Sequence, residues 1–252
     1  MRALALAAIR RSLPDLAAFI HEANQPNPLT IGPLLTSAKD RGKHTIEIAC
    51  LADEVLQPLL RGLPRVGGRI KLGRMTYEVR QVSVGAEVTF DDLAAHPEGR
   101  AIGLRLLTPT AHHAPGAVRR SLVVPDPALY VGSWYRRWNL YAPSPFSEAL
   151  MESVAQQVVI RAFAGGTSAV RLDRVRTFIG FTGRVEFTVL DGPADTMELC
   201  AALWSLARFA EYCGTGVDTM RGMGQTRLIP LSESKAQEAD VLDESSPHSR
   251  EP

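Results

Sequence analysis

Histidine is the side chain in this sequence best suited to proton transfer near neutral pH, because its ordinary pKa is about 6.5. None of the histidines lies four residues from another, and no HExxH run occurs. The three cysteines form no CxxC pair, and no GxSxG run marks a serine nucleophile. We therefore expect no metal and no other cofactor, and any chemistry should be metal-free. The six histidines are His21, His44, His96, His112, His113 and His248.

Two histidine positions stand out by their neighbourhood. His21 ends a predicted helix and precedes a proline-rich loop, where a histidine usually compensates the helix dipole. His112 and His113 follow a predicted strand and precede a basic loop containing glycine. At this pair, contact with nucleic acid and simple solvation remain equally open.

Arginine supplies the positive charge of the chain. The formal net charge is +1, but residues 231–252 carry −4, which leaves +5 on the remainder. Clustered arginines suit phosphate, whereas scattered ones would only solvate the surface. The clusters are Arg119-Arg120, Arg136-Arg137 and the group of Arg171, Arg174, Arg176 and Arg184.

A glycine-rich segment, GTGVDTMRGMGQTR, holds Gly214, Gly216, Gly222 and Gly224. It is no dinucleotide-binding fingerprint, because Thr219 occupies the third glycine position. It is no P-loop either, because no lysine follows its last glycines and it comes after a helix. Two interpretations remain: exposed N–H groups that cradle phosphate together with Arg221 and Arg227, or a flexible connection.

Hydrophobic periodicity places the supporting elements on either side of a polar connection at residues 91–98. The first half predicts a helix over 1–23, a strand at 44–51, a helix at 53–63 and a strand pair or bent strand at 69–84. The second half predicts strands at 101–109, 157–163, 168–173, 177–189 and 228–230, with helices at 127–139, 147–154 and 197–212.

The β-α-β-β-α-β order of the second half is the ferredoxin-like pattern. The first half resembles the same unit without its first strand. We therefore expect an α+β protein with two tandem ferredoxin-like domains, at residues 1–95 and 96–231, and a disordered acidic tail at 232–252. Loss of a central strand should expose strand edges and the apolar face of the first helix.

Composition limits the class of protein. Of 252 residues, 45% are hydrophobic and 22% charged, as in ordinary globular proteins, and no apolar run reaches membrane-spanning length. Three cysteines, an odd number and widely spread, indicate no disulfide framework. We expect a cytoplasmic protein with no membrane partner.

Four motifs in order resemble the CRISPR-associated protein 6 family. They are LAAFIHEANQPNPLTIGPLL at 16–35, LRLLTPT at 104–110 with PDPALYVGSWYRRWN downstream, FIGFTGRVEF at 178–187 and YCGTGVDTMRGMGQTRL at 212–228. The resemblance implies tandem ferredoxin-like domains and a repeat-specific endoribonuclease that cuts precursor CRISPR RNA without metal. It implies attack by the RNA's own 2′-hydroxyl, leaving a 2′,3′-cyclic phosphate and a 5′-hydroxyl.

His21 matches the family's general acid/base histidine. Some members add a tyrosine and a lysine, whose places here hold Leu6 and Asn27. Partnership with other CRISPR effector proteins and homodimerisation stay open. The alternatives are a non-catalytic subunit that holds the repeat RNA, and a tandem ferredoxin-like protein with no RNA role. The expected RNA-binding residues are His112, His113, Arg119, Arg120, Gly214, Gly216, Arg221, Gly222, Gly224 and Arg227.

Overall fold

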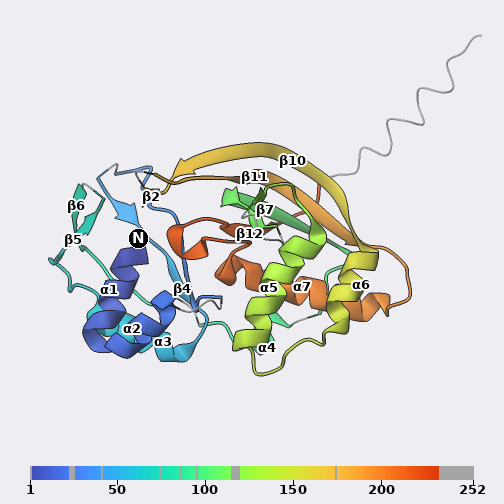
Figure 1. The fold of residues 1–252 in the computed structure, drawn as a ribbon, viewed down its shortest axis with the longest axis horizontal. Helices are drawn as coiled ribbons and strands as arrows, with labels where there is room; N and C mark the ends of the chain where they lie inside the picture. The colour runs from blue at the N-terminus through green and yellow to red at the C-terminus, as the bar shows by residue number, and fades with distance from the viewer. Residues whose placement is uncertain are drawn as a thin grey trace, which may run out of the picture.

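The computed structural model describes residues 2–22, 26–40, 42–73, 75–85, 87–94, 96–114, 120–173 and 175–232. Arg119, Arg174, His248 and the predicted acidic tail beyond Ser232 lie outside these residues. Within them, helices and strands combine into an α+β fold (Figure 1).

Three helices and short strand pairs make up the first half. The helix predicted over 1–23 is two helices, α1 (Arg2–Ser12) and α2 (Pro14–Glu22), because Pro14 cannot continue α1 and instead begins α2. α3 is Asp53–Gly62. The antiparallel pairs are β1 (Leu29–Ile31) with β4 (Ile48–Cys50), β2 (Leu35–Thr36) with β3 (His44–Thr45), and β5 (Arg69–Leu72) with β6 (Met75–Glu78).

The apolar face of α1 is buried, so the expectation of an exposed helix face is wrong. Ala5, Ala8 and Ile9 have 0% exposure and Leu6 has 7%. α3 covers this face at short range: a Cβ atom on Gly62 would lie 1.7 Å from the Ala8 carbonyl oxygen. The glycine therefore allows the two helix backbones to touch, and the first half has its own core.

The second half contains an antiparallel sheet in the order β10-β11-β7-β12. The helices α5, α6 and α7 lie together on one side of this sheet (Figure 1). The predicted β-α-β-β-α-β order is confirmed, with α5 and α6 forming the first helical region. The bounds are β7 (Ala101–Thr110), α5 (Pro127–Tyr141), α6 (Ala149–Gln157), β10 (Val158–Arg171), β11 (Thr177–Val189), α7 (Thr196–Cys213) and β12 (Thr226–Ile229).

One sequence-based boundary was wrong in this sheet. Residues 157–163 and 168–173 were expected to be separate strands, but β10 runs through Gly165 and Gly166. Gly165 pairs with Gly183 of β11, at φ 154° and 145° respectively. A Cβ on Gly165 would lie 2.2 Å from the Thr182 carbonyl oxygen. The glycines are therefore a close-approach point inside the ladder, where they allow the strands to continue.

The larger core lies between the sheet and its helices. Trp134 and Tyr130 of α5 pack with Phe187 of β11, all at 0–1% exposure. The short helix α4 (Phe90–Leu93) adds Phe90, whose ring lies 5.1 Å from that of Trp138. α4 precedes the predicted domain boundary but packs in this second core. The remaining short elements are β8 (His112–His113), β9 (Ser121–Leu122) and η1 (Thr219–Arg221).

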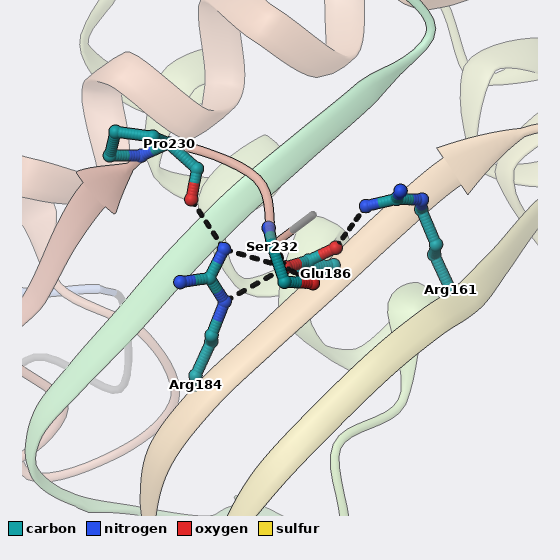
Figure 2. Close-up of polar contacts among 5 residues, drawn as sticks. All are labelled: Arg161, Arg184, Glu186, Pro230 and Ser232. Atoms are coloured by element: carbon teal, nitrogen blue, oxygen red, sulfur yellow. Dashed lines mark hydrogen bonds and ion pairs between the residues drawn. The ribbon is translucent and has the colours of Figure 1, made fainter. Parts of the chain in front are cut away.

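A buried carboxylate fixes the end of the described chain (Figure 2). Glu186 lies between the core residues Val185 and Phe187 on β11 and so points to the opposite face of the sheet. Its side chain is 0% exposed and pairs with both Arg161 and Arg184. The Ser232 backbone N–H and hydroxyl donate to its Oε1 at 2.7 and 2.6 Å. Ser232, predicted to begin the tail, is therefore held against the sheet.

The partners of Glu186 decide its ionisation. Burial alone would raise the pKa of this carboxyl, but the Ser232 hydrogen bonds and the Arg184 guanidinium outweigh it and lower the pKa to about 2. The carboxylate is charged, and removing it would leave two arginines facing each other without a counter-ion.

We expect Glu186→Ala to destabilise the protein by about 1–3 kcal/mol, because it leaves the Ser232 N–H and two partly exposed arginines without their acceptor. The free energy of unfolding from denaturant titration measures this. Asp191→Ala is the control: it removes the exposed Arg100–Asp191 pair, which should contribute below about 1 kcal/mol. Equal losses in the two variants would contradict a structural role for the Glu186 cluster.

Candidate nucleic-acid interface

A cleft of about 730 Å³ lies where the two halves of the chain meet. Its walls come from α1, the segment after α2, β8, β9, α5, the turn between β10 and β11, and the glycine-rich segment 214–225. The lining residues are Arg2, Pro26, Asn27, His113, Ser121, Ser133, Arg136, Arg137, Leu172, Arg176, Thr177, Phe178, Gly216, Val217, Asp218, Thr219, Met220 and Arg221.

The cleft is strongly basic, with five arginines in its lining against one aspartate. Asp218 pairs with Arg221 at 2.8 Å, and Arg176 pairs with Asp173 outside the cleft. Within the part of the chain that the structure describes, Arg136 and Arg137 form no ion pair with a carboxylate. Partial burial, and then the neighbouring charge of Arg137, lowers the pKa of Arg136. An anion bound in the cleft would relieve this repulsion.

Arg137 connects α5 to the glycine-rich segment. It is 8% exposed, and its guanidinium donates to the carbonyl oxygens of Ser133 at 3.1 Å and Gly216 at 2.9 Å. Trp134, one turn earlier on the neighbouring face, donates from Nε1 to the Thr215 hydroxyl at 2.9 Å. α5 therefore holds one wall of the cleft through buried hydrogen bonds, each worth about 0.5–3 kcal/mol net.

The glycines of this segment shape the backbone. Gly214, Gly216, Gly222 and Gly224 have φ between 67° and 90°, which residues with a Cβ rarely adopt. A Cβ on Gly224 would lie 1.9 Å from the Thr215 carbonyl oxygen. Every one of the four N–H groups already donates to an acceptor within the protein: Ala210 O, Ser133 Oγ, Thr219 O and Pro109 O, in that order. This corrects the expectation that exposed glycine N–H groups form the phosphate cradle.

The same segment is buried, so a flexible connection is also the wrong description. Thr215 is 0% exposed and Met220 is 3% exposed. Met220 packs in the core of the first half, and the Gln225 side chain donates to the Ile31 carbonyl oxygen at 3.4 Å. The Thr30 hydroxyl donates to the Cys213 carbonyl oxygen at 2.9 Å. The glycine-rich segment thus binds the two halves of the chain together.

His21 lies at the last turn of α2 and is exposed. Arg2 contacts it: one Arg2 Nη is 3.4 Å from both the His21 ring Nδ1 and the His21 carbonyl oxygen. Arg2 itself lines the cleft, and its Nε is buried without a hydrogen-bond partner among the described residues. His21 therefore contacts a lining residue but is not itself among the residues that line the cleft.

The other expected contact residues divide into four groups. His113 and Arg221 line the cleft, whereas Arg120 is exposed beside β9. Arg227 faces elsewhere, because it pairs with Glu47 at 3.2 Å. Arg119 lies outside the described residues.

His112 is unsuited to surface contact, contrary to expectation. It is 4% exposed, and its ring lies 5.1 Å from that of Tyr130. Burial, and then the charges of Arg136 and Arg137, lowers the pKa of His112 to about 3. The imidazole is neutral at physiological pH and belongs to the protein interior.

Sequence reasoning missed several of the residues that line the cleft. The arginine clusters of the sequence did include Arg136, Arg137 and Arg176. Position in the sequence, however, did not indicate which arginines line the same cleft. Arg2 carried no signal at all. Its role depends on the first turn of α1 packing beside the end of α2, which only the tertiary structure decides.

The described residues contain no group of three or more His, Cys, Asp or Glu side chains placed to hold a metal ion. None of the helices described is both long and apolar enough to cross a membrane.

Burial of His112 predicts a specific pH dependence. The unfolded chain takes up a proton at this residue below about pH 6.5, whereas the folded protein does so only near pH 3. The free energy of unfolding should therefore fall on acidification, by up to about 1.4 kcal/mol per pH unit from this residue. His112→Phe should remove this contribution, so that its free energy of unfolding falls by about 2 kcal/mol less than that of the wild type between pH 7.5 and 5.

Denaturant titrations at pH 7.5 and 5 measure the difference. His113→Phe is the control, because His113 is exposed and should leave the pH dependence of the wild type in place. Identical pH dependence in wild type and His112→Phe would contradict a neutral buried imidazole.

The α+β architecture with a basic cleft between its halves defines a class of protein suited to a polyanionic ligand. Residues 104–226 match the family model described as CRISPR-associated endoribonuclease Cas6. A comparison with curated proteins gives no match.

Solved structures resemble nearly the whole chain. A Cas6 product complex has 26% identity and a TM-score of 0.80, over 90% of this chain and 92% of that one. A second Cas6 product complex has 26% identity and a TM-score of 0.72, over 91% and 93%. Thermus thermophilus Cas6 has 25% identity and a TM-score of 0.69, over 90% and 89%. The second half of the chain thus matches the Cas6 family model, and nearly the whole chain resembles solved Cas6 structures.

Proposed function

We propose that this protein binds CRISPR repeat RNA in the arginine-lined cleft and cuts the precursor transcript within the repeat. The observation that carries the proposal is the cleft itself: it is basic, and Arg2 connects it directly to His21. The match of residues 104–226 to the Cas6 family model supports RNA cleavage, and the similar Cas6 structures include product complexes and a substrate mimic complex. One similar structure is of a histidine-to-alanine mutant.

The proposed reaction is an in-line transesterification. The 2′-oxygen of the RNA forms a bond to the adjacent phosphorus, and the bond from phosphorus to the 5′-oxygen breaks. The 2′-hydroxyl loses a proton, the leaving 5′-oxygen gains one, and the products are a 2′,3′-cyclic phosphate and a 5′-hydroxyl. His21 serves as general acid/base, a contribution of about 10²- to 10⁴-fold, and no metal takes part.

Arginines supply the electrostatic part of this mechanism. Arg2 adjoins His21 and has a buried Nε with no partner among the described residues, so it is suited to contact the scissile phosphate. Arg136 and Arg221 would hold the RNA backbone, and the glycine-rich segment would form the rigid wall against which the RNA lies. Arginine suits both tasks because its planar fork matches phosphate oxygens.

We also propose that the first half follows the ferredoxin-like pattern from its first helix onward. Its order of helix, paired strands β1 and β4, and helix α3 is that of such a unit after its first strand.

A second candidate is a non-catalytic subunit that holds repeat RNA. One observation favours it: His21 does not line the cleft, and only Arg2 connects it to the lining. RNA binding without cleavage by the wild type would support this alternative.

His21→Ala should abolish cleavage in EDTA while leaving RNA affinity within a few-fold, because a general acid/base acts on the transition state more than on binding. Denaturing gels measure cleavage of the CRISPR repeat transcript from the same genome. Replacing the 2′-hydroxyl at the scissile position by hydrogen should stop cleavage by the wild type.

His96→Ala, which changes another exposed histidine, is the matched control and should cleave normally. Cleavage that survives His21→Ala would move the acid/base role to His113 in the cleft. A requirement for added magnesium would overturn the metal-free mechanism.

Arg136→Gln should weaken binding most at low salt. Each lost phosphate contact lowers the log–log slope of affinity against salt by about 0.7 for single-stranded RNA. Filter binding from 50 to 300 mM salt is a suitable measurement. Arg10→Gln on the exposed side of α1 is the control and should keep the wild-type slope. Equal slopes in all three proteins would place the RNA elsewhere.

A further inference from the structure

A second, smaller cavity of about 250 Å³ adjoins the cleft. It lies between α2, α3 and α5, and its walls are mainly apolar: Leu16, Phe19, Ile20, Pro28, Val55 and Leu140. Phe19 is 62% exposed and Leu140 is 41% exposed, so the mouth of the cavity is open. Its volume is just below the usual range for small-molecule pockets, about 300–1,000 Å³, which suits a single planar ring system.

Pro26 and Asn27 form a wall common to the cleft and to this cavity. The Tyr141 hydroxyl donates to the Pro26 carbonyl oxygen and so fixes this wall to α5. Because these two residues line both spaces, a nucleotide whose phosphate lies beside them in the cleft would be a direct neighbour of the cavity.

Asn27 has a hydrogen-bond acceptor without a partner at this wall. Its Oδ1 is buried and has no partner among the described residues. A buried unpaired acceptor costs about 1–3 kcal/mol, which a donor from a ligand would recover. An asparagine amide presents an acceptor and a donor side by side, and this pair matches the N6 amine and N7 of adenine.

We propose that the cavity holds one unstacked base of the RNA bound in the cleft, with Phe19 against the face of the base and Asn27 reading its edge. The inference rests on the proposed function, since it requires RNA in the cleft. A base meets the three features together: a flat apolar body, a polar edge, and attachment to a phosphate. Adenine is the preferred base because it satisfies both groups of the Asn27 amide.

The first test removes the aromatic ring. Phe19→Ala is compared with Phe163→Ala, since Phe163 on β10 is similarly exposed at 58% but lies outside both cavities. Both variants bind the repeat transcript with hydrogen in place of the 2′-hydroxyl at the scissile position. We expect Phe19→Ala to lose about 5- to 150-fold in affinity, the usual range for one stacked base, and Phe163→Ala to lose almost nothing.

The second test locates the base. Each nucleotide near the cut is replaced in turn by an abasic residue. At one position, the affinity of the wild type for the abasic RNA should equal the affinity of Phe19→Ala for the intact RNA. Combining Phe19→Ala with that abasic RNA should lower the affinity no further than either change alone. At that position Asn27→Leu should no longer distinguish adenine from purine, which lacks the amine.

The outcomes separate the two proposals. A wild type that neither binds nor cuts repeat RNA contradicts the proposed function. A wild type that does both, with Phe19→Ala indistinguishable from Phe163→Ala at every nucleotide, contradicts the base pocket alone. Phe19→Leu, which keeps apolar area and removes the ring, gives the same comparison if Phe19→Ala does not fold.

Discussion

The hydrogen bonds from Arg137 and Trp134 to the glycine-rich segment are the interactions on which the cleft depends. They join the middle of α5 to Gly216 and Thr215, which are 79 and 81 residues away in sequence. Ser133 completes the set by accepting the Gly216 N–H at 3.2 Å. Because all three groups are buried, losing one would leave an unpaired polar atom in the interior. Residues of a single helix therefore hold the part of this wall around Thr215 and Gly216.

This arrangement separates two roles that arginine plays in the same cleft. The Arg137 guanidinium donates hydrogen bonds to protein carbonyl oxygens and so has a structural role, although it still adds positive charge to the cleft lining. Arg136, one residue along, is exposed and lines the same cleft. Adjacent positions on one helix thus face different surroundings, and only the exposed one is available to a ligand.

The glycine-rich segment also explains how the two halves hold together. Met220 enters the core of the first half, while Thr215 and Thr226 share a short buried hydrogen bond of 2.6 Å within the second. Such a segment cannot move without breaking contacts on both sides. A rigid wall suits a site that must hold a phosphate in line for attack, because misplacement of reacting atoms costs rate steeply. The Glu186 cluster, on the opposite face of the sheet, fixes the chain just after β12 and so supports the same strand from behind.

Local patterns in the sequence determined the larger elements. The apolar spacing of 127–139 and 197–212 predicted α5 and α7, and the β-α-β-β-α-β order of the second half was correct. These predictions succeed because periodicity depends on near neighbours. The short strands of the first half and the continuous β10 were harder, since strand pairing is non-local and Gly165 resembles a break until Gly183 is placed opposite it.

The tertiary structure alone decided which charged and polar groups meet. His112 and His113 are adjacent in sequence, yet one is buried and neutral and the other lines the cleft, because successive residues in a strand face opposite sides. Arg2 meets His21 through helix packing that no local pattern encodes. The glycines of 214–225 were visible as a motif, but their function is to allow tight internal bonding, which depends on acceptors contributed by distant segments. The sequence thus determined which groups are available for chemistry, while long-range packing decided which of them share a site.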